Sequence, residues 1–293
     1  MEVYFSKLAG DNYLLNLLVL GRPWNGIVIG MFSLLGYLLA GGNEIYSAVF
    51  LFLAFFLQYF GGTILNDLSD LKSDEINMPF RPLSTKVIST NQAKFVFIAS
   101  YISSFLISLY FSFNLFIGTF LFFLITMLYS VPPFRLVGRG FLGNISLGVV
   151  SIFVPAMTGF AVGKNIFTMS EALLFFFVFL TLFFSFFYLI KDFKDLEGDK
   201  KSGKKTFVLL YGVNLTIKLS IIGSIIFFTL AILSLNLLLN SNLLLIISAI
   251  FLTFFIYYKT KLFKSVNYQE IFTKTRLIFM GFLVFLFMLI IYK

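Results

Sequence analysis

Residues 172–190 read ALLFFFVFLTLFFSFFYLI and are followed at once by Lys191 and Asp192. This stretch contains no charged residue, and its length is close to the roughly 20 apolar residues that an α-helix needs to cross a bilayer. Similar runs recur along the chain, of which 59% is hydrophobic and only 12% is charged. Because a soluble domain carries about a quarter charged residues, the composition predicts an integral membrane protein.

The apolar runs predict an all-α, polytopic membrane protein with nine transmembrane helices in a bundle around a central cavity. We treat residues 1–293 as a single transmembrane domain. The nine helices are expected near residues 14–40, 46–66, 94–112, 114–131, 141–162, 170–190, 213–236, 242–258 and 275–292.

Basic residues gather on one side of the predicted membrane. Of the 22 Lys and Arg residues, only Lys164 and Lys293 fall outside the N-terminus and the links after the second, fourth, sixth and eighth helices. The positive-inside rule places this charged side, and the N-terminus with it, in the cytoplasm of a multi-pass cell-membrane protein. The net charge of +9 is then an orientation signal, and nucleic-acid binding is not predicted.

The chain contains neither cysteine nor histidine. Disulfides, a thiol nucleophile and a Cys/His zinc site are therefore excluded. Imidazole cannot act as a general base either. Any chemistry must use carboxylates, lysine, arginine, tyrosine and amides.

Two acidic segments, at the ends of the second and sixth helices, follow one pattern. Residues 66–74 read NDLSDLKSD and residues 191–199 read KDFKDLEGD, so both fit x-Asp-x-x-Asp-Leu-x-x-Asp. This spacing places three carboxylates on one face of a helix. The first cluster (residues 66–74) contains Asp67, Asp70 and Asp74, and the second cluster (residues 192–199) contains Asp192, Asp195 and Asp199.

Three carboxylates on one helix face repel one another, and a cation relieves the repulsion. Oxygen ligands of this kind suit magnesium, which proteins hold through carboxylates together with substrate phosphates. Four helices separate the clusters, so both lie on the same membrane face, as in a parallel repeat of four-helix units. We expect two magnesium ions that hold a diphosphate between the clusters; the alternative is a pair of solvated helix ends.

These motifs resemble the UbiA superfamily of intramembrane prenyltransferases. Its first signature, Asn-Asp-x-x-Asp-x-x-x-Asp, matches residues 66–74, and its second, Asp-x-x-x-Asp, matches Asp195 and Asp199. Residues 22–25 (RPWN) and 129–135 (YSVPPFR) are similar to further elements of that family. Residues 77–83 (NMPFRPL) and 191–206 look most like its archaeal digeranylgeranylglyceryl phosphate synthases.

The resemblance implies that magnesium ions are held by the two clusters. One ion is assigned to Asn66, Asp67, Asp70 and Asp74, and the other to Asp192, Asp195 and Asp199. Arg81, Arg135 and Lys194 are candidates for binding the diphosphate or an acceptor phosphate. Asn25 and Tyr129 are expected at the substrate site. Lys200, Lys201, Lys204 and Lys205 are interpreted as an anchor near anionic lipid headgroups.

The archaeal-like elements favour transfer of a geranylgeranyl group from its diphosphate to geranylgeranylglyceryl phosphate, a lipid-like phosphorylated acceptor. Prenylation of an aromatic ring in quinone or pigment synthesis is the second hypothesis. Quinone-pathway members often carry Arg where this chain has Leu71, which disfavours an aromatic acid. A cation-coupled transporter is the alternative from another class, although transport carboxylates usually lie near the midplane. The oligomeric state stays open.

Overall fold

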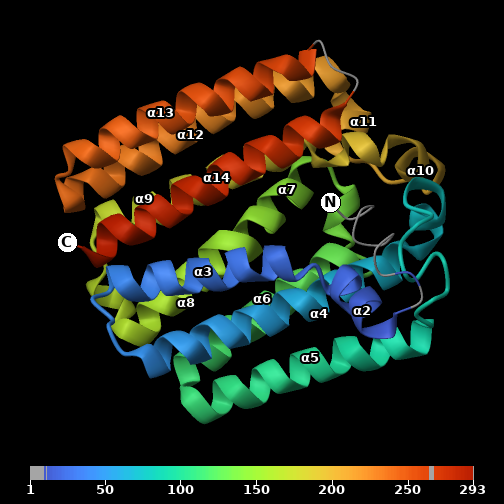
Figure 1. Ribbon diagram of the computed structural model, residues 1–293, viewed down its shortest axis with the longest axis horizontal. Coiled ribbons are helices and arrows are strands. Elements are labelled where there is room, and N and C mark those ends of the chain that lie inside the picture. The colour runs from blue at the N-terminus through green and yellow to red at the C-terminus, as the bar shows by residue number, and fades with distance from the viewer. Residues whose placement is uncertain (1–9, 11, 264–266, 293) are drawn as a thin grey trace.

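The computed structural model describes Gly10, residues 12–263 and residues 267–292. Over these residues the chain is helical without a strand, and its β contact is an isolated parallel bridge between Arg139 and Lys205. The long helices lie side by side in one bundle, with connecting segments at its two ends (Figure 1). The all-α fold predicted from the sequence is confirmed.

Each expected transmembrane helix corresponds to a helical span within the described residues. Eight spans are long and apolar enough to cross a membrane, and a bent helix pair makes a ninth. The eight are α4 (Ile45–Asn77), α5 (Thr90–Phe111), α6 (Phe113–Ser130), Phe141–Gly163, Glu171–Lys194, α12 (Val213–Leu239), Asn242–Phe263, which includes α13 (Asn242–Thr260), and α14 (Tyr268–Ile291). The protein is therefore a multi-pass membrane protein.

The bent pair consists of α2 (Tyr13–Gly21) and α3 (Pro23–Leu39), which meet at 47°. Pro23 is the first residue of α3, where its missing N–H costs nothing. Arg22 takes a left-handed backbone conformation, with φ of 47°, and ends α2. The bend therefore comes from a Pro-directed restart of the helix, and Arg22 stands at the corner.

The fifth span changes helix type in the middle. It consists of α7 (Phe141–Gly148), the π-helix η2 (Val149–Phe153) and α8 (Val154–Gly163). Pro155 has no N–H to donate to the carbonyl of Ser151, four residues earlier, so the regular ladder is interrupted there. Such π-helical turns occur often at functional sites, and Ser151 lines the cavity described below.

The sixth span also changes type, from α9 (Glu171–Phe187) to the 3-10 helix η4 (Tyr188–Lys194). The Ser220 hydroxyl donates to the Phe186 carbonyl at 2.7 Å, and Nζ of Lys259 donates to the Phe187 carbonyl at 3.2 Å. These side chains satisfy carbonyls at the transition. The short helices α10 (Leu196–Lys201) and α11 (Phe207–Tyr211) follow.

Close helix contacts depend on small residues. A Cβ added to Gly159 of α8 would lie 1.8 Å from the Ser33 carbonyl oxygen, and one on Gly36 would lie 1.9 Å from that of Ala156. Helices α3 and α8 therefore touch backbone to backbone, as small residues allow in membranes. Buried Phe side chains fill the space between α9, α12, α13 and α14, in a cluster that also includes Phe32 of α3 and Phe160 of α8.

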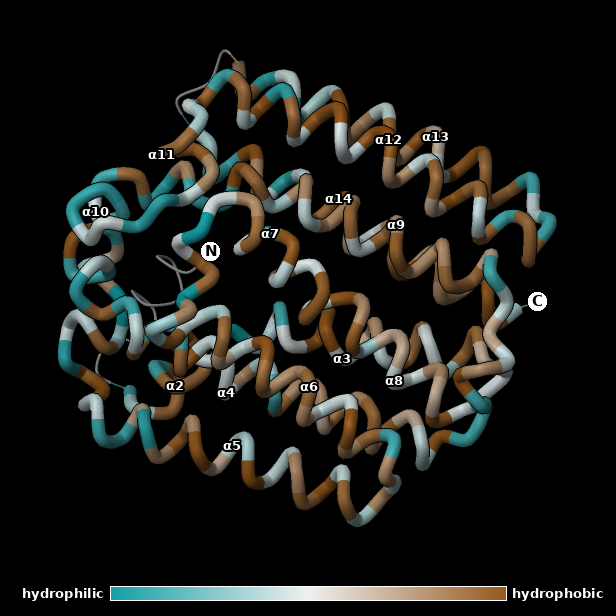
Figure 2. The backbone as a smooth tube through the Cα atoms, turned by 180° about the vertical axis from the view of Figure 1, so that it is seen from behind, coloured by the Kyte–Doolittle hydropathy of each residue, from teal (hydrophilic) through white to brown (hydrophobic). Residues whose placement is uncertain are grey.

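Most of the hydrophilic residues lie at one end of the bundle (Figure 2). The segment after α4, the segment that contains α10 and the 3-10 helix η5 (Lys261–Phe263) after α13 all lie at this end (Figure 1). This arrangement brings both acidic clusters to the same end. The division into two four-helix repeat units stays a prediction.

Candidate active site

The first cluster lies on the last turns of α4, which continues to Asn77 without a break. Asp67, Asp70 and Asp74 are 2%, 6% and 8% exposed, so all three are buried. The expectation of a single acidic helix face is therefore met here. Asn66 lines the adjoining cavity, and its Nδ2 is buried without a hydrogen-bond partner among the described residues.

The second cluster does not lie on one continuous helix, so this part of the prediction was wrong. Asp192 belongs to η4, Asp195 stands at the break, and Asp199 belongs to α10. The break is stabilised by Asn77, whose side-chain amide donates to the Asp195 carbonyl at 3.0 Å and accepts from the Gly198 N–H at 2.8 Å. A tertiary contact with the end of α4 thus replaces regular helix here.

Lysine and arginine side chains provide the positive charges closest to the first cluster. Arg22 contacts Asp67 at 2.5 Å, and Arg81 forms ion pairs with both Asp67 and Asp74. Arg135 contacts Asp70 at 2.6 Å. The sequence suggested that Arg81 and Arg135 bind phosphate, but in this structure both are paired with aspartates.

Lys204 joins the two clusters. Its ammonium lies 2.9 Å from a carboxylate oxygen of Asp70 and 3.2 Å from one of Asp199. Its side chain is only 7% exposed, so assigning Lys204 to a headgroup anchor was wrong. Backbone hydrogen bonds between Lys205 and residues 138–140 hold this loop in place. Segments far apart in sequence therefore converge, as the paired motifs predicted.

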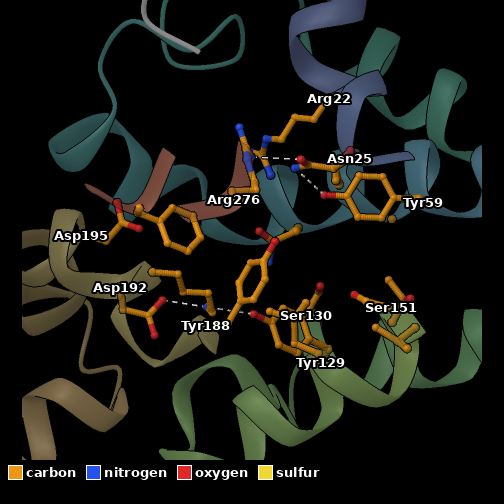
Figure 3. A pocket seen from close by; sticks show the side chains of 18 of the residues that line it. Arg22, Asn25, Tyr59, Tyr129, Ser130, Ser151, Tyr188, Asp192, Asp195 and Arg276 are labelled. Carbon is orange, nitrogen blue, oxygen red and sulfur yellow. Dashed lines mark hydrogen bonds and ion pairs between the residues drawn. The ribbon is translucent and has the colours of Figure 1, made fainter. Parts of the chain in front are cut away.

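A cavity of about 230 Å³ opens beside the clusters. Its polar lining includes the predicted site residues Asn25, Tyr129, Asp192 and Asp195 (Figure 3). Lys194, also predicted, belongs to the same lining. Arg135 and the three aspartates of the first cluster do not line it. Its apolar lining consists of Phe122, Leu147, Val150 and Phe272. The volume is below the roughly 300–1,000 Å³ of common ligand pockets, so it suits a headgroup better than an entire prenyl chain.

Several cavity residues were not predicted from the sequence. Those with a charged or phenolic side chain are Arg22, Tyr59, Tyr188, Lys191 and Arg276. Lys191 contacts Asp192 at 2.7 Å and donates to the Tyr129 hydroxyl at 3.2 Å. Arg276 lies within the apolar last helix, and a charge inside a membrane span is itself a signal of function. That signal could have identified Arg276.

Burial affects the ionisation of the second cluster. Burial raises the pKa of Asp199 to about 6, although the Lys204 ammonium works against the rise. Burial also raises the pKa of the Asp195 carboxyl, against the opposing effect of Lys194. For Lys204, burial lowers the pKa, but the Asp70 and Asp199 carboxylates outweigh burial and raise it. The Asp199 carboxyl therefore holds its proton up to a higher pH than an ordinary aspartate does.

The donor atoms fit a hard divalent cation, but not in their present pairing. Among the described residues, no three carboxylates lie close enough together to hold an ion. One oxygen of Asp195 is buried without a hydrogen-bond partner in that same part of the chain, and Asp195 lines the cavity. Six buried or half-buried aspartates supply the oxygen ligands that magnesium prefers. Binding requires that some basic side chains leave their aspartates.

The sequence profile of the UbiA prenyltransferase family matches residues 27–290. This chain belongs to the UbiA prenyltransferase family. It is therefore a prenyltransferase, which argues against the transporter alternative. The match covers the second to the eighth predicted spans in full and parts of the first and the last.

Curated members of the UbiA family support this assignment. The digeranylgeranylglyceryl phosphate synthase of Thermococcus sibiricus is 31% identical over 206 residues, which cover 70% of this chain and 71% of that protein. The enzyme of the same name from Methanocaldococcus jannaschii is 29% identical over 219 residues, covering 72% and 71%.

Solved UbiA-family structures share the fold. One reported for digeranylgeranylglyceryl phosphate synthase has a TM-score of 0.66 and 25% identity, covering 95% of this chain and 97% of that one. A UbiA homologue from Archaeoglobus fulgidus, bound to GPP and Mg²⁺, has a TM-score of 0.67 and 22% identity, covering 94% and 99%. The latter likeness shows the fold alone.

Proposed function

We propose that this prenyltransferase transfers a geranylgeranyl group from its diphosphate to the free hydroxyl of geranylgeranylglyceryl phosphate. The observation that carries the proposal is the Lys204 bridge, which joins Asp70 and Asp199 beside a cavity with cationic and apolar walls. The relatives that bear the name digeranylgeranylglyceryl phosphate synthase support the choice of acceptor.

Magnesium use is supported by the donor set and by the magnesium bound to the Archaeoglobus fulgidus homologue. We assign one ion to the first cluster with Asn66, and a second ion to Asp192, Asp195 and Asp199. The ions would neutralise the charge that develops on the leaving diphosphate. The chain's own contribution is to hold both clusters at one end of the bundle and to present their oxygens together.

The basic residues take a second role in this proposal. Once released from the aspartates, Arg22 and Arg81 line the cavity with guanidinium groups that can hold phosphate oxygens in bidentate contacts. The carbon–oxygen bond of the donor breaks and the diphosphate leaves with the electron pair. The oxygen of the acceptor hydroxyl then bonds to the allylic carbon to form the ether, and its proton passes to the departed diphosphate. Phe122 and Phe272 help to exclude water from the allylic cation.

The distribution of basic residues supports a cytoplasmic active site. Both clusters lie at the end of the bundle that carries the described parts of the links after the even-numbered spans, and most Lys and Arg residues occur in these links or near the N-terminus. The positive-inside rule orients that end toward the cytoplasm. We therefore place the donor diphosphate on the cytoplasmic side of the cell membrane, together with the N-terminus, although residues 1–9 lie outside the described residues.

A product assay with several acceptors tests the proposed function. Membranes containing the full chain, magnesium and labelled geranylgeranyl diphosphate are expected to yield an ether product with geranylgeranylglyceryl phosphate. Chelation of magnesium should remove that product. An aromatic product in place of the ether would move the chain to the quinone or pigment hypothesis. No product with any acceptor would contradict both.

The magnesium requirement should depend on pH because the pKa of Asp199 is about 6. Below that pH the folded, metal-free protein holds a proton on Asp199, and the metal must displace it. Each pH unit below 6 is expected to raise the magnesium concentration for half-maximal rate by up to about tenfold. Magnesium titrations of transfer at pH 5, 6 and 7.5 would check this. A requirement that stays constant over this range would contradict it.

A further inference from the structure

Arg276 differs from the other arginines that line the cavity. Arg22 and Arg81 form ion pairs with aspartates. Arg276 instead donates to the side-chain carbonyl of Asn25 at 3.0 Å, and over the described residues it has no ion pair with a carboxylate. Its Nε is buried and has no hydrogen-bond partner in that part of the chain. Arg276 therefore presents a positive charge whose described partner is a neutral amide.

The orientation of Arg276 is fixed by a short network. Asn25, on α3, donates through Nδ2 to the Tyr59 hydroxyl at 3.0 Å, so its carbonyl oxygen is the atom that faces Arg276 (Figure 3). Tyr59 belongs to α4 and Arg276 to α14, so three helices meet here. The network holds the guanidinium at the cavity wall with several N–H donors left for a ligand.

A charge at this place needs an anion. Arg276 lies in a membrane-spanning helix, where an ionised side chain is costly unless it is paired or faces a polar cavity. Amide contacts do not neutralise it. Arg276 and Tyr188 both line the cavity. An anionic group bound in the cavity would supply the missing charge.

We propose that Arg276, positioned by Asn25 and Tyr59, binds the phosphate monoester of the acceptor. This inference rests on the proposed function. In geranylgeranylglyceryl phosphate the phosphate is carried by the carbon next to the one that bears the hydroxyl, so it must enter the same cavity as the reacting atoms. In the proposed function, the donor diphosphate binds to the ions held by the two clusters and to Arg22 and Arg81. Because two phosphate groups repel each other, a separate cation for the acceptor keeps them apart.

The first test compares Arg276→Gln with the wild-type full chain. The KM for geranylgeranylglyceryl phosphate is expected to rise at least about tenfold, as for loss of a charge-assisted hydrogen bond. The KM for the donor should change less than about threefold. With geranylgeranylglycerol, which lacks the phosphate, the two proteins should have the same kcat/KM. Arg276→Lys, which keeps the charge but not the planar fork, should lie between them.

The matched control is Arg139→Gln. Arg139 is exposed and donates to the Pro133 carbonyl at 2.8 Å, outside the cavity lining. It should leave both KM values unchanged. An increase in the donor KM alone for Arg276→Gln would assign Arg276 to the diphosphate and overturn the proposal. Unchanged KM values would overturn it as well.

A binding measurement separates this inference from the proposed function. sn-Glycerol 1-phosphate, added without magnesium to the purified full chain, should raise the thermal unfolding temperature of the wild type but not of Arg276→Gln. If Arg276→Gln does not fold, Arg276→Lys replaces it, and the rise in its unfolding temperature should be smaller than that of the wild type. No shift in the wild type, or the same shift in the variants, overturns the proposal. The expected shifts without any ether product would support the subsite and refute the acceptor assignment.

Discussion

Replacing Asp70 or Asp199 by asparagine is expected to lower magnesium-dependent prenyl transfer by about a hundred- to a thousandfold. Both side chains are buried, at 6% and 3% exposure, and both contact Lys204. Asparagine keeps the shape but removes the charge that a divalent ion needs. Loss of a group that stabilises transition-state charge has effects of this size. Release of diphosphate from labelled donor, measured in membranes, is the appropriate readout.

The matched control for Asp199→Asn is Glu197→Gln, in the same short helix α10. The side chain of Glu197 is 77% exposed and pairs only with the exposed Lys201 among the described residues. Exposed ion pairs contribute little, so activity should stay within about twofold of the wild type. Retained magnesium-dependent transfer in Asp70→Asn or Asp199→Asn would refute the assignment of metal ligands.

The second large effect concerns stability rather than chemistry. Gly159→Ala is expected to destabilise the bundle by about 2–3 kcal/mol. The added Cβ would lie 1.8 Å from the carbonyl oxygen of Ser33. A backbone atom cannot rotate away, so α3 and α8 must move apart. Thermal unfolding of the purified protein in detergent measures the loss.

Gly281→Ala is the control for this substitution. Gly281 lies in α14, and a Cβ there meets nothing within 4 Å. Because alanine is the better helix former, its unfolding temperature should equal or exceed that of the wild type. Equal unfolding temperatures for the Gly159 and Gly281 variants would show that the α3–α8 contact is not tightly packed. Activity should also fall in Gly159→Ala, since α3 carries Asn25.

Much of the fold could be predicted from hydropathy. The apolar run at residues 172–190 corresponds to α9 and the start of η4, and each of the nine expected spans corresponds to a helical span. Apolar length is a sufficient signal because a bilayer forces backbone groups to bond within each segment. The apolar run ends near residue 66, but the spacing of the first cluster predicted that the helix continues through Asp74, and α4 does continue, to Asn77.

The site was predicted in part. The spacing of aspartates found both clusters and placed them on one membrane face. It missed the break at Asp195, which depends on hydrogen bonds with Asn77 across 118 and 121 residues of sequence. Lys204 was assigned wrongly to a headgroup anchor. Lysine runs near membranes are common, and the neighbouring residues in the sequence do not show that Lys204 is buried. The hydrogen bond between Arg276 and Asn25 could be identified only from the structure.

Hydropathy and residue spacing are local properties, so they were enough to predict that the chain crosses the membrane repeatedly and carries two matched acidic clusters. The pairing of each cation with its aspartate depends on how distant helices pack, because a buried charge takes its partner from whichever helix lies beside it. Asp70 forms an ion pair with Lys204, and Asn25 accepts a hydrogen bond from Arg276, which lies 251 residues later in the chain. Those pairings follow from packing, which no single segment encodes.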